Sequence, residues 1–425
     1  MKPQNEPVCS GVSPKKHTIF KLKRTVYQIA ISGIRLLQAA ERITNHDILG
    51  RGNYIGRKRN GSRVNNSPVC FVNLDSINVT PYFKIYEELL STPYDLIYWD
   101  RVGSEEKNGA RNTHRYFCPV RKTNSIDNLM DLAKGYLGFK RFASRFLIEN
   151  HYDIVVALTG NAAVLLGKTL KTHYKKRYIM DIRDYFLEKI PMYHYAEQSV
   201  IDCSALALIS SPAFTTFLGK HDFQIIHNMQ TIGKSYIDAF RQRTHECRPF
   251  VIANIGTAKS LDLDRMTIDY FANDPRFEVR FIGRGFEALE EYRNVTKADN
   301  IIISGSFPSS ETMKHYRDVD AILATYGSKR THVKYALPNK LYFAAQLELP
   351  ILASPGTYLA QVATKNHLGL ALDINDPIGK EAILSLYQDN AINMRREGAS
   401  SFLRQAQKDN QAALCKIANI LSAIN

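Results

Sequence analysis

The stretch YALPNKLYFAAQLELPILAS, residues 335–354, decides the fold. Its middle part, from Pro338 onward, has the composition of a buried helix, and its end, from Pro350, is a short apolar run. Proline suits the first turn of a helix, where a backbone N–H would have no partner within the helix. The apolar run predicts a buried strand of a parallel sheet. A helix that begins at a proline beside such a strand offers its free N–H groups to a phosphate.

The alternation of helix and strand continues on both sides of this stretch. In the second half of the chain we expect strands at residues 250–256, 277–283, 300–306, 321–326, 350–355 and 369–374, and helices at residues 263–273, 286–294, 310–318, 339–348, 357–366 and 377–422. In the first half we expect strands at residues 68–74, 94–100, 113–120, 152–158, 176–182 and 206–210, and helices at residues 81–90, 124–150, 159–174, 195–205 and 211–220. Such alternation is typical of parallel βαβ units. The sequence therefore predicts an α/β fold of two Rossmann-like domains whose parallel sheets face a cleft.

The pattern divides the chain into five segments. They are a basic N-terminal extension at residues 1–66, a first domain at 67–227, a linker at 228–248, a second domain at 249–395 and a C-terminal helix at 396–425. Each domain has about 150 residues or more, which is enough to bury a core of its own.

The charge of the chain is concentrated at its beginning. The 425 residues include 56 Lys and Arg and 41 Asp and Glu, a formal charge of +15. Residues 1–66 hold 13 basic and three acidic residues, which contributes +10 of that total. Within this extension, residues 19–44 have the spacing of an amphipathic helix with one basic face. Such a helix could lie on an anionic membrane surface. Alternatively, it could pack against the protein core with its basic face in solvent. The basic charge lies at one end and no nucleic-acid motif accompanies it, so no nucleic-acid partner is expected.

Other compositional features exclude several classes of protein. We find no run of 18 apolar residues and no signal peptide, so we expect no membrane span and a cytoplasmic location. The six cysteines are widely spaced, which predicts reduced thiols rather than a disulfide framework or a zinc knuckle.

Two glycine turns follow expected strands of the second domain. Gly256 and Lys259 follow the first strand, and Arg284 and Gly285 follow the second. Glycine lets a phosphate approach backbone N–H groups, and a cation neutralises its charge. An ordinary turn with a surface lysine is the better interpretation of the first stretch taken alone, and a tight turn explains the second stretch equally well. The GxG at residues 283–285 lacks the third glycine of a dinucleotide fingerprint, since position 288 is alanine.

The stretch at residues 335–354 resembles the C-terminal domain of GT-B glycosyltransferases. The resemblance is to the family-4-like retaining enzymes of bacterial surface-polysaccharide assembly (capsule and exopolysaccharide), in which the pattern is roughly P-N-x-L-x-E-A-x-A-x-G-x-P-V-I-A-S. The matching positions are Pro338, Asn339, Leu341, Ala344, Pro350 and the run at residues 351–354. The two glycine turns and the segments at residues 301–311, 316–326, 94–101 and 178–185 are also similar to the family. The likeness covers residues 67–395.

The resemblance implies a function for each domain. The first domain would bind a lipid-linked glycan acceptor, and the second would bind a nucleotide-sugar donor, a UDP- or GDP-sugar. The chain would then be a metal-independent, retaining hexosyltransferase, peripheral on the inner face of the plasma membrane. The implied donor-binding residues are Gly256, Lys259, Arg284, Gly285, Tyr326, Pro338, Asn339, Lys340 and Tyr342. The implied catalytic residues are Asp184 and Arg183, and the implied acceptor-binding residues are Asn73, Asp75, Ser76 and Asn161. An ion pair that fixes the loop after residue 182 is an equally good interpretation of Arg183 and Asp184.

The sequence departs from the family at three places. The family commonly has two glutamates seven residues apart around the proline, and their positions here are Tyr335 and Phe343. The second glutamate normally holds the ribose, and a phenyl ring cannot accept a hydrogen bond from a hydroxyl. Either Tyr342 or a backbone carbonyl then holds the ribose, or donor binding is altered. The loop at residues 158–161 also lacks the catalytic histidine of the family.

Two alternative functions stay open. A catalytically silent GT-B module that binds a partner glycosyltransferase or a glycan would explain the missing glutamate and histidine. A sugar-nucleotide epimerase shares the two-domain design but needs acid and base carboxylates in the cleft. The Asp318-Val319-Asp320 sequence has the spelling of a metal-binding DxD motif, but it precedes a strand rather than following one, so no metal is expected.

Overall fold

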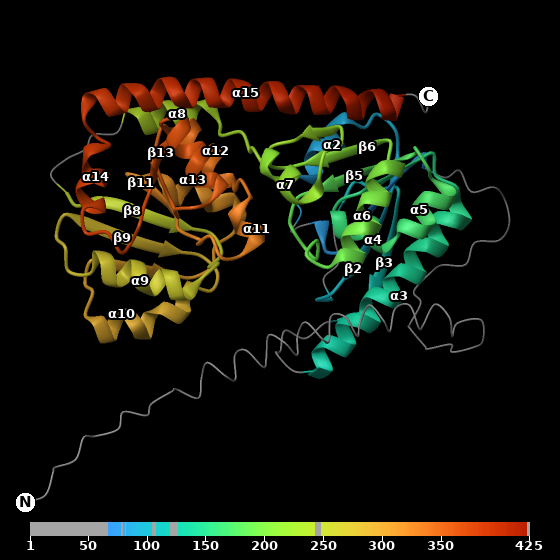
Figure 1. The fold of residues 1–425 in the computed structure, drawn as a ribbon, viewed down its shortest axis with the longest axis horizontal. Coiled ribbons are helices and arrows are strands. Elements are labelled where there is room, and N and C mark those ends of the chain that lie inside the picture. Colours follow the sequence, from blue (N-terminus) through green and yellow to red (C-terminus); the bar gives the residue numbers. More distant parts are fainter. Residues whose placement is uncertain are drawn as a thin grey trace, which may run out of the picture. The chain divides into compact units, whose positions relative to one another are not determined.

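The computed structural model describes residues 67–77, 80, 82–103, 108–119, 126–242 and 248–422. The helix expected at residues 19–44, and the rest of the basic extension, lie outside these residues. The chain divides into two units, of which residues 66–117 and 143–425 form the second, and this second unit contains both sheets. Figure 1 draws the fold and labels many of the elements by the names used below.

The first sheet has seven parallel strands in the order β3-β2-β1-β4-β5-β6-β7 among the described residues. These strands are β1 (Val69–Asn73), β2 (Tyr94–Asp100), β3 (Asn112–Phe117), β4 (Ile154–Ala157), β5 (Tyr178–Ile182), β6 (Leu206–Ile209) and β7 (Phe223–Ile225). The inner strands are buried at every position, for example β2, because helices cover both faces of a parallel sheet. The associated helices are α2 (Phe83–Leu89), α3 (Ile126–Asn150), α4 (Gly160–Leu165), α5 (Gly167–His173), α6 (Pro191–Cys203), the short η2 (Pro212–Phe214) and α7 (Thr215–Leu218).

The second sheet has six parallel strands in the order β10-β9-β8-β11-β12-β13 among the described residues. They are β8 (Phe250–Ile255), β9 (Phe277–Ile282), β10 (Ile301–Ser304), β11 (Ala321–Ala324), β12 (Ile351–Ala353) and β13 (Gly369–Ala371). The helical elements are α8 (Lys234–Arg241), α9 (Leu261–Phe271), η3 (Phe286–Leu289), α10 (Glu290–Thr296), η4 (Ser309–Tyr316), α11 (Thr331–Lys334), α12 (Asn339–Leu347), α13 (Tyr358–Lys365) and α14 (Gly379–Ser385). The predicted α/β fold with two parallel sheets is confirmed.

The order of strands in both sheets reverses at one point. In the first sheet, β1 lies between β2 and β4, and in the second, β8 lies between β9 and β11. Ligands of open parallel sheets bind at the carboxyl ends of the strands on either side of such a point. The fold therefore directs attention to the segments that follow β1, β4, β8 and β11.

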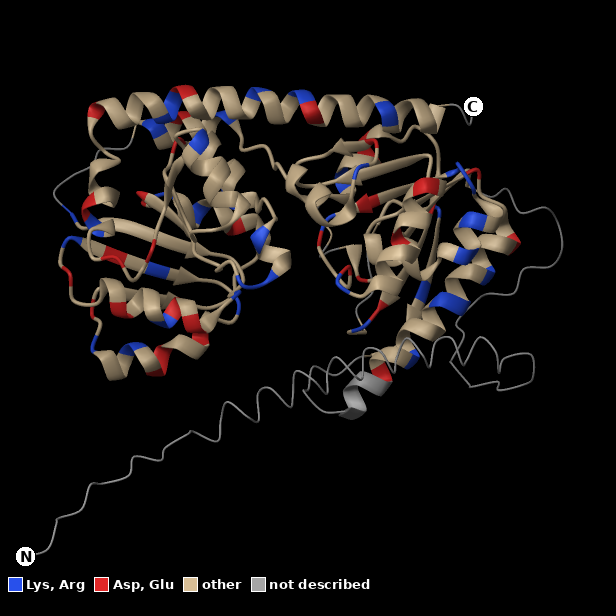
Figure 2. Cartoon of the chain, in the orientation of Figure 1, with Lys and Arg blue, Asp and Glu red and all other residues tan. Residues whose placement is uncertain are grey.

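Helix α15 (Asp389–Ser422) contributes to the cores of both domains. Ala399 and Ala406 belong to the core around β8, β11 and α12, and Ala413, Ile417 and Leu421 belong to the core around β1, β4 and β6. These residues recur at spacings of seven and four, the period of one helix face. Figure 2 colours the chain by residue type and shows positions of basic and of acidic residues along the same helix. At about 1.5 Å per residue, a 34-residue helix spans about 50 Å, long enough to contact both cores.

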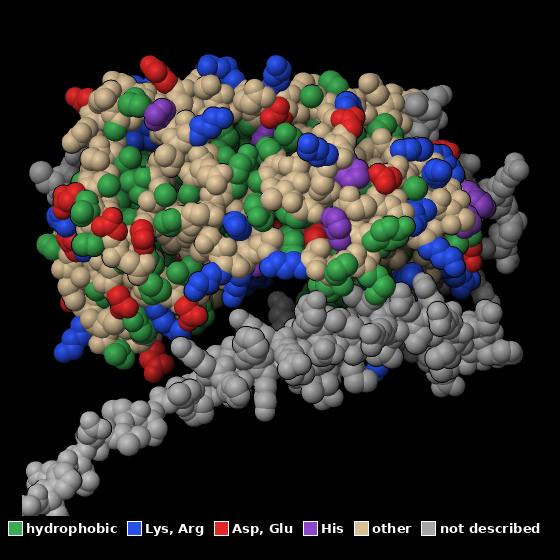
Figure 3. All heavy atoms as spheres, in the orientation of Figure 1, with side chains coloured by type: hydrophobic (Ala, Val, Ile, Leu, Met, Phe, Trp, Pro, Cys, Tyr) green, Lys and Arg blue, Asp and Glu red, His purple; other side chains and the backbone are tan. Residues whose placement is uncertain are grey.

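Two further features of the described residues bear on the sequence predictions. Within the described part of the chain, no helix is both long and apolar enough to cross a membrane. None of the four described cysteines is joined by a disulfide to another described cysteine, and the other two lie outside the described residues. Figure 3 shows basic, acidic and apolar side chains interspersed on the face of the molecule that it draws.

Candidate active site

The carboxyl edge of the second sheet carries two glycine turns that pack against each other. Gly256 follows β8 with φ of 132°, and Gly283 follows β9 with φ of 129°. A Cβ atom on Gly283 would lie 1.8 Å from the carbonyl oxygen of Gly256, so only glycine fits there. The N–H of Gly256 donates to the carbonyl of Ile282 at 2.8 Å, and the N–H of Ala258 donates to the carbonyl of Arg284 at 3.0 Å. These contacts hold the loops after β8 and β9 side by side.

Two cations stand on these loops without partners. The side chains of Lys259 and Arg284 are exposed, and neither forms a hydrogen bond or an ion pair with a described residue. Gly285 beside them has φ of 91°, and its N–H donates to Glu287 Oε2 at 2.7 Å. Burial is the main cause of the lowered pKa values of Lys340 and His332, and the positive charge of Lys259 lowers both further. The structure thus places two free positive charges at the edge where ligands of this fold bind.

Helix α12 begins at the same edge. Pro338 is its N-cap and Asn339 its first residue, as the sequence pattern predicts. The ring of Tyr326, in the segment after β11, lies 5.2 Å from the ammonium of Lys340. Burial raises the pKa of the Tyr326 hydroxyl, so it stays protonated and able to donate a hydrogen bond.

Lys340 points into the protein rather than toward solvent. Its ammonium donates to Asn254 Oδ1 on β8 and, at 3.2 Å, to the carbonyl of Leu323 on β11. It thereby links the two strands between which the sheet order reverses. Burial lowers the pKa of Lys340 to about 7, and burial raises the pKa of nearby Asp264 to about 7. Asn254 connects the two groups, because its Nδ2 lies 3.3 Å from Asp264 Oδ1.

The next residues of α12 face the core. The hydroxyl of Tyr342 lies 2.7 Å from His227 Nδ1, and its ring stacks on Phe402. Phe343, at the position of the family's ribose-binding glutamate, is buried with its ring 5.7 Å from that of Tyr316. Neither side chain has a polar atom free for a ribose among these contacts, and the donor role of Tyr342 stays a prediction.

In the first domain, Arg183 follows β5 and is buried. Its Nε lies 2.6 Å from Asp181 Oδ1, and its NH1 donates to Asn228 Oδ1 at 2.9 Å and to the carbonyl of Ile226 at 3.1 Å. The guanidinium also lies 4.2 Å from the ring of Tyr82. The neighbouring Asp181 carboxylate is the main reason that the pKa of Arg183 is raised in spite of its burial. These contacts fix the loop that carries Asp184.

Asp184 differs from its neighbour because it is exposed. It acts electrostatically on His332 of α11, where burial is the largest cause of a lowered pKa. Arg330, just before α11, donates to the carbonyl of Lys259 at 3.1 Å and so joins α11 to the donor-side loop. Asp184 of the first domain and Lys259 of the second both act electrostatically on His332. The sequence analysis missed His332 and Arg330, because a single helical turn has no periodic signal.

The four predicted acceptor-binding residues lie at the carboxyl edge of the first sheet. Asn73 Nδ2 donates to Thr80 Oγ1 at 2.9 Å, and Asp75 Oδ1 accepts from the N–H of Ser76 at 2.9 Å. Asn161, in the first turn of α4, accepts from the hydroxyl of Tyr193 at 3.3 Å. Asp75 is exposed and keeps one carboxylate oxygen outside this turn. The role of these residues toward an acceptor stays a prediction.

The second aspartate of the Asp318-Val319-Asp320 sequence has a structural role, and the first is exposed. Asp320 is buried, pairs with Arg248 at 2.7 and 3.0 Å, and accepts from the N–H of Val251 at 2.8 Å. This carboxylate holds the chain where it enters β8.

Comparisons with known proteins identify the fold. No protein-family model and no curated protein matches the chain. Sucrose-phosphate synthase from Thermosynechococcus elongatus superposes with a TM-score of 0.60 at 10% identity, covering 84% of this chain and 98% of that chain. HepE from Anabaena, solved with UDP and glucose, gives a TM-score of 0.54 at 14% identity, covering 84% of this chain and 100% of that chain. WaaG, a glycosyltransferase involved in lipopolysaccharide biosynthesis, gives 0.54 at 14% identity, covering 83% of this chain and 99% of that chain. The chain therefore has the two-domain GT-B fold of these glycosyltransferases.

Proposed function

We propose that the protein is a glycosyltransferase that takes a sugar from a nucleotide-sugar donor. The observation that carries this proposal is the pair of free cations, Lys259 and Arg284, beside the packed glycine turns at the point where the second sheet reverses its order. A departing nucleoside diphosphate gains negative charge, and positioned cations and N–H groups stabilise that charge without a metal. HepE, which shares the fold, was solved with UDP and glucose.

The test is to measure nucleotide binding by the full chain, using calorimetry with UDP, GDP, ADP and the matching sugar nucleotides. Lys259→Ala and Arg284→Ala should each weaken binding of the preferred diphosphate about tenfold or more, since a hydrogen bond to a charged group contributes about 1.5–3 kcal/mol. Lys408→Ala, an exposed cation of α15, is the matched control and should bind like wild type. Equal affinity in all three variants would show that the diphosphate does not bind here.

The acceptor and the stereochemistry are finer parts of the proposal. We infer a lipid-linked glycan acceptor in surface-polysaccharide synthesis, supported by the family resemblance and by the charge of +10 on residues 1–66. The enzyme would then work at the cytoplasmic face of the membrane. Full-length protein should sediment with anionic vesicles and residues 67–425 should not. Retention of the anomeric configuration, also drawn from the resemblance, is tested by proton NMR of the first product formed.

Asp184 is our candidate for orienting the acceptor hydroxyl. It is exposed at the end of β5, and the ion pair of Arg183 with Asp181 fixes the preceding residue. Asp184→Asn should lower turnover while donor affinity stays within about twofold of wild type. Arg183 is then a positioning residue, because its guanidinium is occupied within the protein.

A second candidate function rests on Phe343. Because this buried ring stands where the family has a ribose-binding glutamate, a catalytically silent module that binds a partner glycosyltransferase is the alternative. Donor hydrolysis or transfer by the purified protein excludes it. A folded protein that neither binds nor hydrolyses any sugar nucleotide would favour it.

A further inference from the structure

A cavity of about 440 Å³ lies beside the candidate active site. The first domain lines it with the segment at residues 185–194 and with Thr216 and Phe217, and the second domain lines it with residues of the 328–335 segment. Its size is within the range of small-molecule sites, about 300–1,000 Å³. The second-domain wall is adjacent to the donor-side loop, because Arg330 donates to the carbonyl of Lys259 at 3.1 Å.

The first-domain side of this cavity is lined by two buried or partly buried polar side chains, Glu188 and His194, and a third, Glu197, lies on the same helix as His194. Glu188 lines the cavity, is 8% exposed, and accepts from the N–H of Phe186 at 2.7 Å. His194 also lines it, and its buried Nδ1 has no partner among the described residues. Glu197, one turn further along α6, is 1% exposed, and neither of its carboxyl oxygens has a partner among the described residues. Buried polar groups are normally hydrogen-bonded, so the unpartnered Nδ1 of His194 in the cavity wall points to a polar ligand. Glu197 lies outside the lining, in the layer behind it.

The two acids interact with each other. Burial, and then the charge of Glu188, raise the pKa of Glu197 to about 8, so Glu197 is mostly protonated at neutral pH. Burial also raises the pKa of Glu188. Tyr185 lines the same cavity, and burial, followed by smaller contributions from the charges of Glu188 and Glu197, raises the pKa of its hydroxyl. Two buried carboxyls that interact tend to ionise one at a time, which leaves one acceptor and one donor of hydrogen bonds.

The second-domain wall of the cavity carries basic side chains, whereas the first-domain wall carries a buried acid. Lys329 and Lys334 line the cavity, both are exposed, and neither has a carboxylate partner among the described residues. Lys334 instead lies 5.4 Å from the ring of Tyr335. Lys189, on the first-domain side, is a third exposed cation whose ammonium has no carboxylate partner within the described part of the chain. A ligand that satisfies both walls therefore has hydroxyl groups at one end and a negative charge at the other.

We propose that this cavity binds the acceptor, and that the acceptor is a sugar carrying a phosphate or carboxylate group. Lys329 and Lys334 bind the anionic group, while Glu188 and His194 form hydrogen bonds with hydroxyl groups of the ring. Glu197 lies behind them and is a positioning residue. This inference rests on the proposed glycosyltransferase function and specifies its substrate class.

The experiment is ligand-observed NMR and calorimetry on the full chain with three probes: glucose 1-phosphate, glucuronate and neutral glucose. The subsite predicts that at least one anionic sugar binds at least tenfold more tightly than glucose. Comparing glucose 1-phosphate with glucuronate identifies whether the lysines prefer a phosphate or a carboxylate group. The double variant Lys329→Ala/Lys334→Ala should lose at least tenfold of this affinity, and Glu188→Gln should lose several-fold. The exposed control Lys408→Ala should bind like wild type.

Two further affinity measurements distinguish this site from the donor site. Lys259→Ala should keep its affinity for the anionic sugar, and the double lysine variant should keep its affinity for the preferred nucleoside diphosphate. Anionic-sugar binding that depends on Lys259 but not on Lys329 and Lys334 would overturn the subsite, as would equal affinity of wild type, Glu188→Gln and the double variant. If wild type binds no nucleotide but binds the anionic sugar through Lys329 and Lys334, the proposed function fails and the subsite stands.

Discussion

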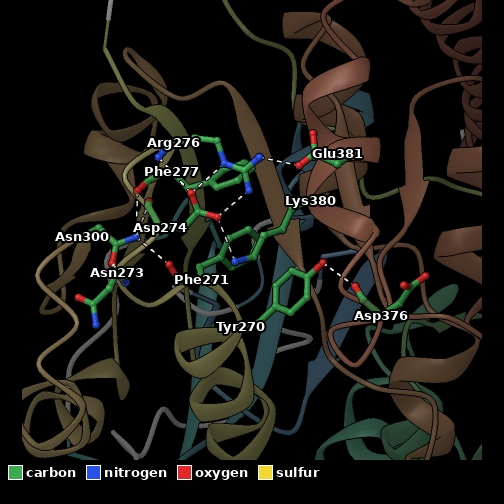
Figure 4. Close-up of polar contacts among 10 residues, drawn as sticks. All are labelled: Tyr270, Phe271, Asn273, Asp274, Arg276, Phe277, Asn300, Asp376, Lys380 and Glu381. Atoms are coloured by element: carbon green, nitrogen blue, oxygen red, sulfur yellow. Dashed lines mark hydrogen bonds and ion pairs between the residues drawn. The ribbon is translucent and has the colours of Figure 1, made fainter.

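Two polar clusters of this molecule shift the pKa values of their carboxyl groups in opposite directions. The first lies at the amino end of β9, where Asp274 accepts from Arg276 at 2.8 and 2.9 Å and from Lys380 at 3.1 Å (Figure 4). These donors lower the pKa of Asp274 well below its usual range. The second is the buried pair Glu188 and Glu197, where the pKa of each carboxyl is raised, chiefly by burial.

The difference follows from the supply of hydrogen-bond partners. In Figure 4, Asn300 Nδ2 donates to the carbonyls of Phe271, Asp274 and Phe277, and its Oδ1 accepts from the N–H of Asn273. This cluster uses its polar atoms to join α9, β9 and the residue before β10, so it stabilises the fold. In the first domain, Glu188 accepts one hydrogen bond from the N–H of Phe186, and neither carboxyl oxygen of Glu197 has a partner among the described residues. An unbonded buried carboxyl costs stability unless a ligand or water supplies the bonds. A fully bonded cluster indicates structure, and a buried unsatisfied one indicates a site.

The largest effect that tests this contrast is expected for Glu197→Gln, which should change how the free energy of unfolding depends on pH. The pKa of Glu197 is about 8 in the folded protein against 4.5 for an ordinary glutamate, so the folded state keeps a proton that the unfolded state releases. Wild-type stability should fall as the pH rises from about 4.5 to about 8, and glutamine removes this loss. Between these values the free energy of unfolding of the variant should gain on the order of 4 kcal/mol over wild type. Urea unfolding at both pH values measures it.

Glu149→Gln is the matched control for that experiment. It removes an exposed carboxylate of α3 that pairs with Arg145, and its difference from wild type should change little over the same pH range. A Glu197→Gln difference that is equally constant would show that Glu197 has partners in solution, and the contrast between the clusters would fail.

The next largest effect is expected for Asn300→Ala. The change leaves three carbonyls and the N–H of Asn273 without their side-chain partner, at a cost of about 3 kcal/mol in the free energy of unfolding. Asn419→Ala on the exposed face of α15 is the control and should change stability by less than about 0.5 kcal/mol. An equal effect of the two substitutions would remove the structural role assigned to the network.

The smallest effect is expected for Asp274→Asn. The lowered pKa of Asp274 means that its ion pairs contribute stability above the ordinary pKa of about 3.9, and that this contribution disappears as the pH falls through the folded-state value. The melting temperature of the variant should therefore lie slightly below that of wild type at pH 7, and the gap should close in strong acid. A gap that widens in acid would contradict the assigned sign.

Much of the architecture could be predicted from the sequence. The strand expected at residues 94–100 is β2 with the same bounds, and the strand expected at 250–256 is β8, one residue shorter. Such strands are buried on both faces, so their apolar runs are continuous. The helix expected at 310–318 is the 3₁₀ segment η4 instead, and β7 and α11 were missed. These short elements have three to eight residues, too few for a periodic signal, and neighbouring segments stabilise them.

The candidate site was predictable only in part. The glycine turns and the start of α12 carry local signals, and the structure places them together at one edge. Helix α6 begins at Pro191, earlier than the expected residue 195, and this start puts His194 and Glu197 on one helix face at a spacing of three. The sequence analysis had noted no role for Glu188 or Glu197. Recognising Pro191 as a first helical residue would have been the available signal.

The sequence by itself determined the alternation of strands and helices, the two parallel sheets and the glycines that the turns after β8 and β9 require. Tertiary structure alone decided which charges are available for chemistry. The ammonium of Lys340 bonds to Asn254, 86 positions earlier in the chain, whereas the side chain of Lys259 has no hydrogen-bond or ion-pair partner among the described residues. Periodicity and turn chemistry are local properties that a short stretch expresses on its own. Burial and the pairing of charges depend on segments that meet only in the folded chain.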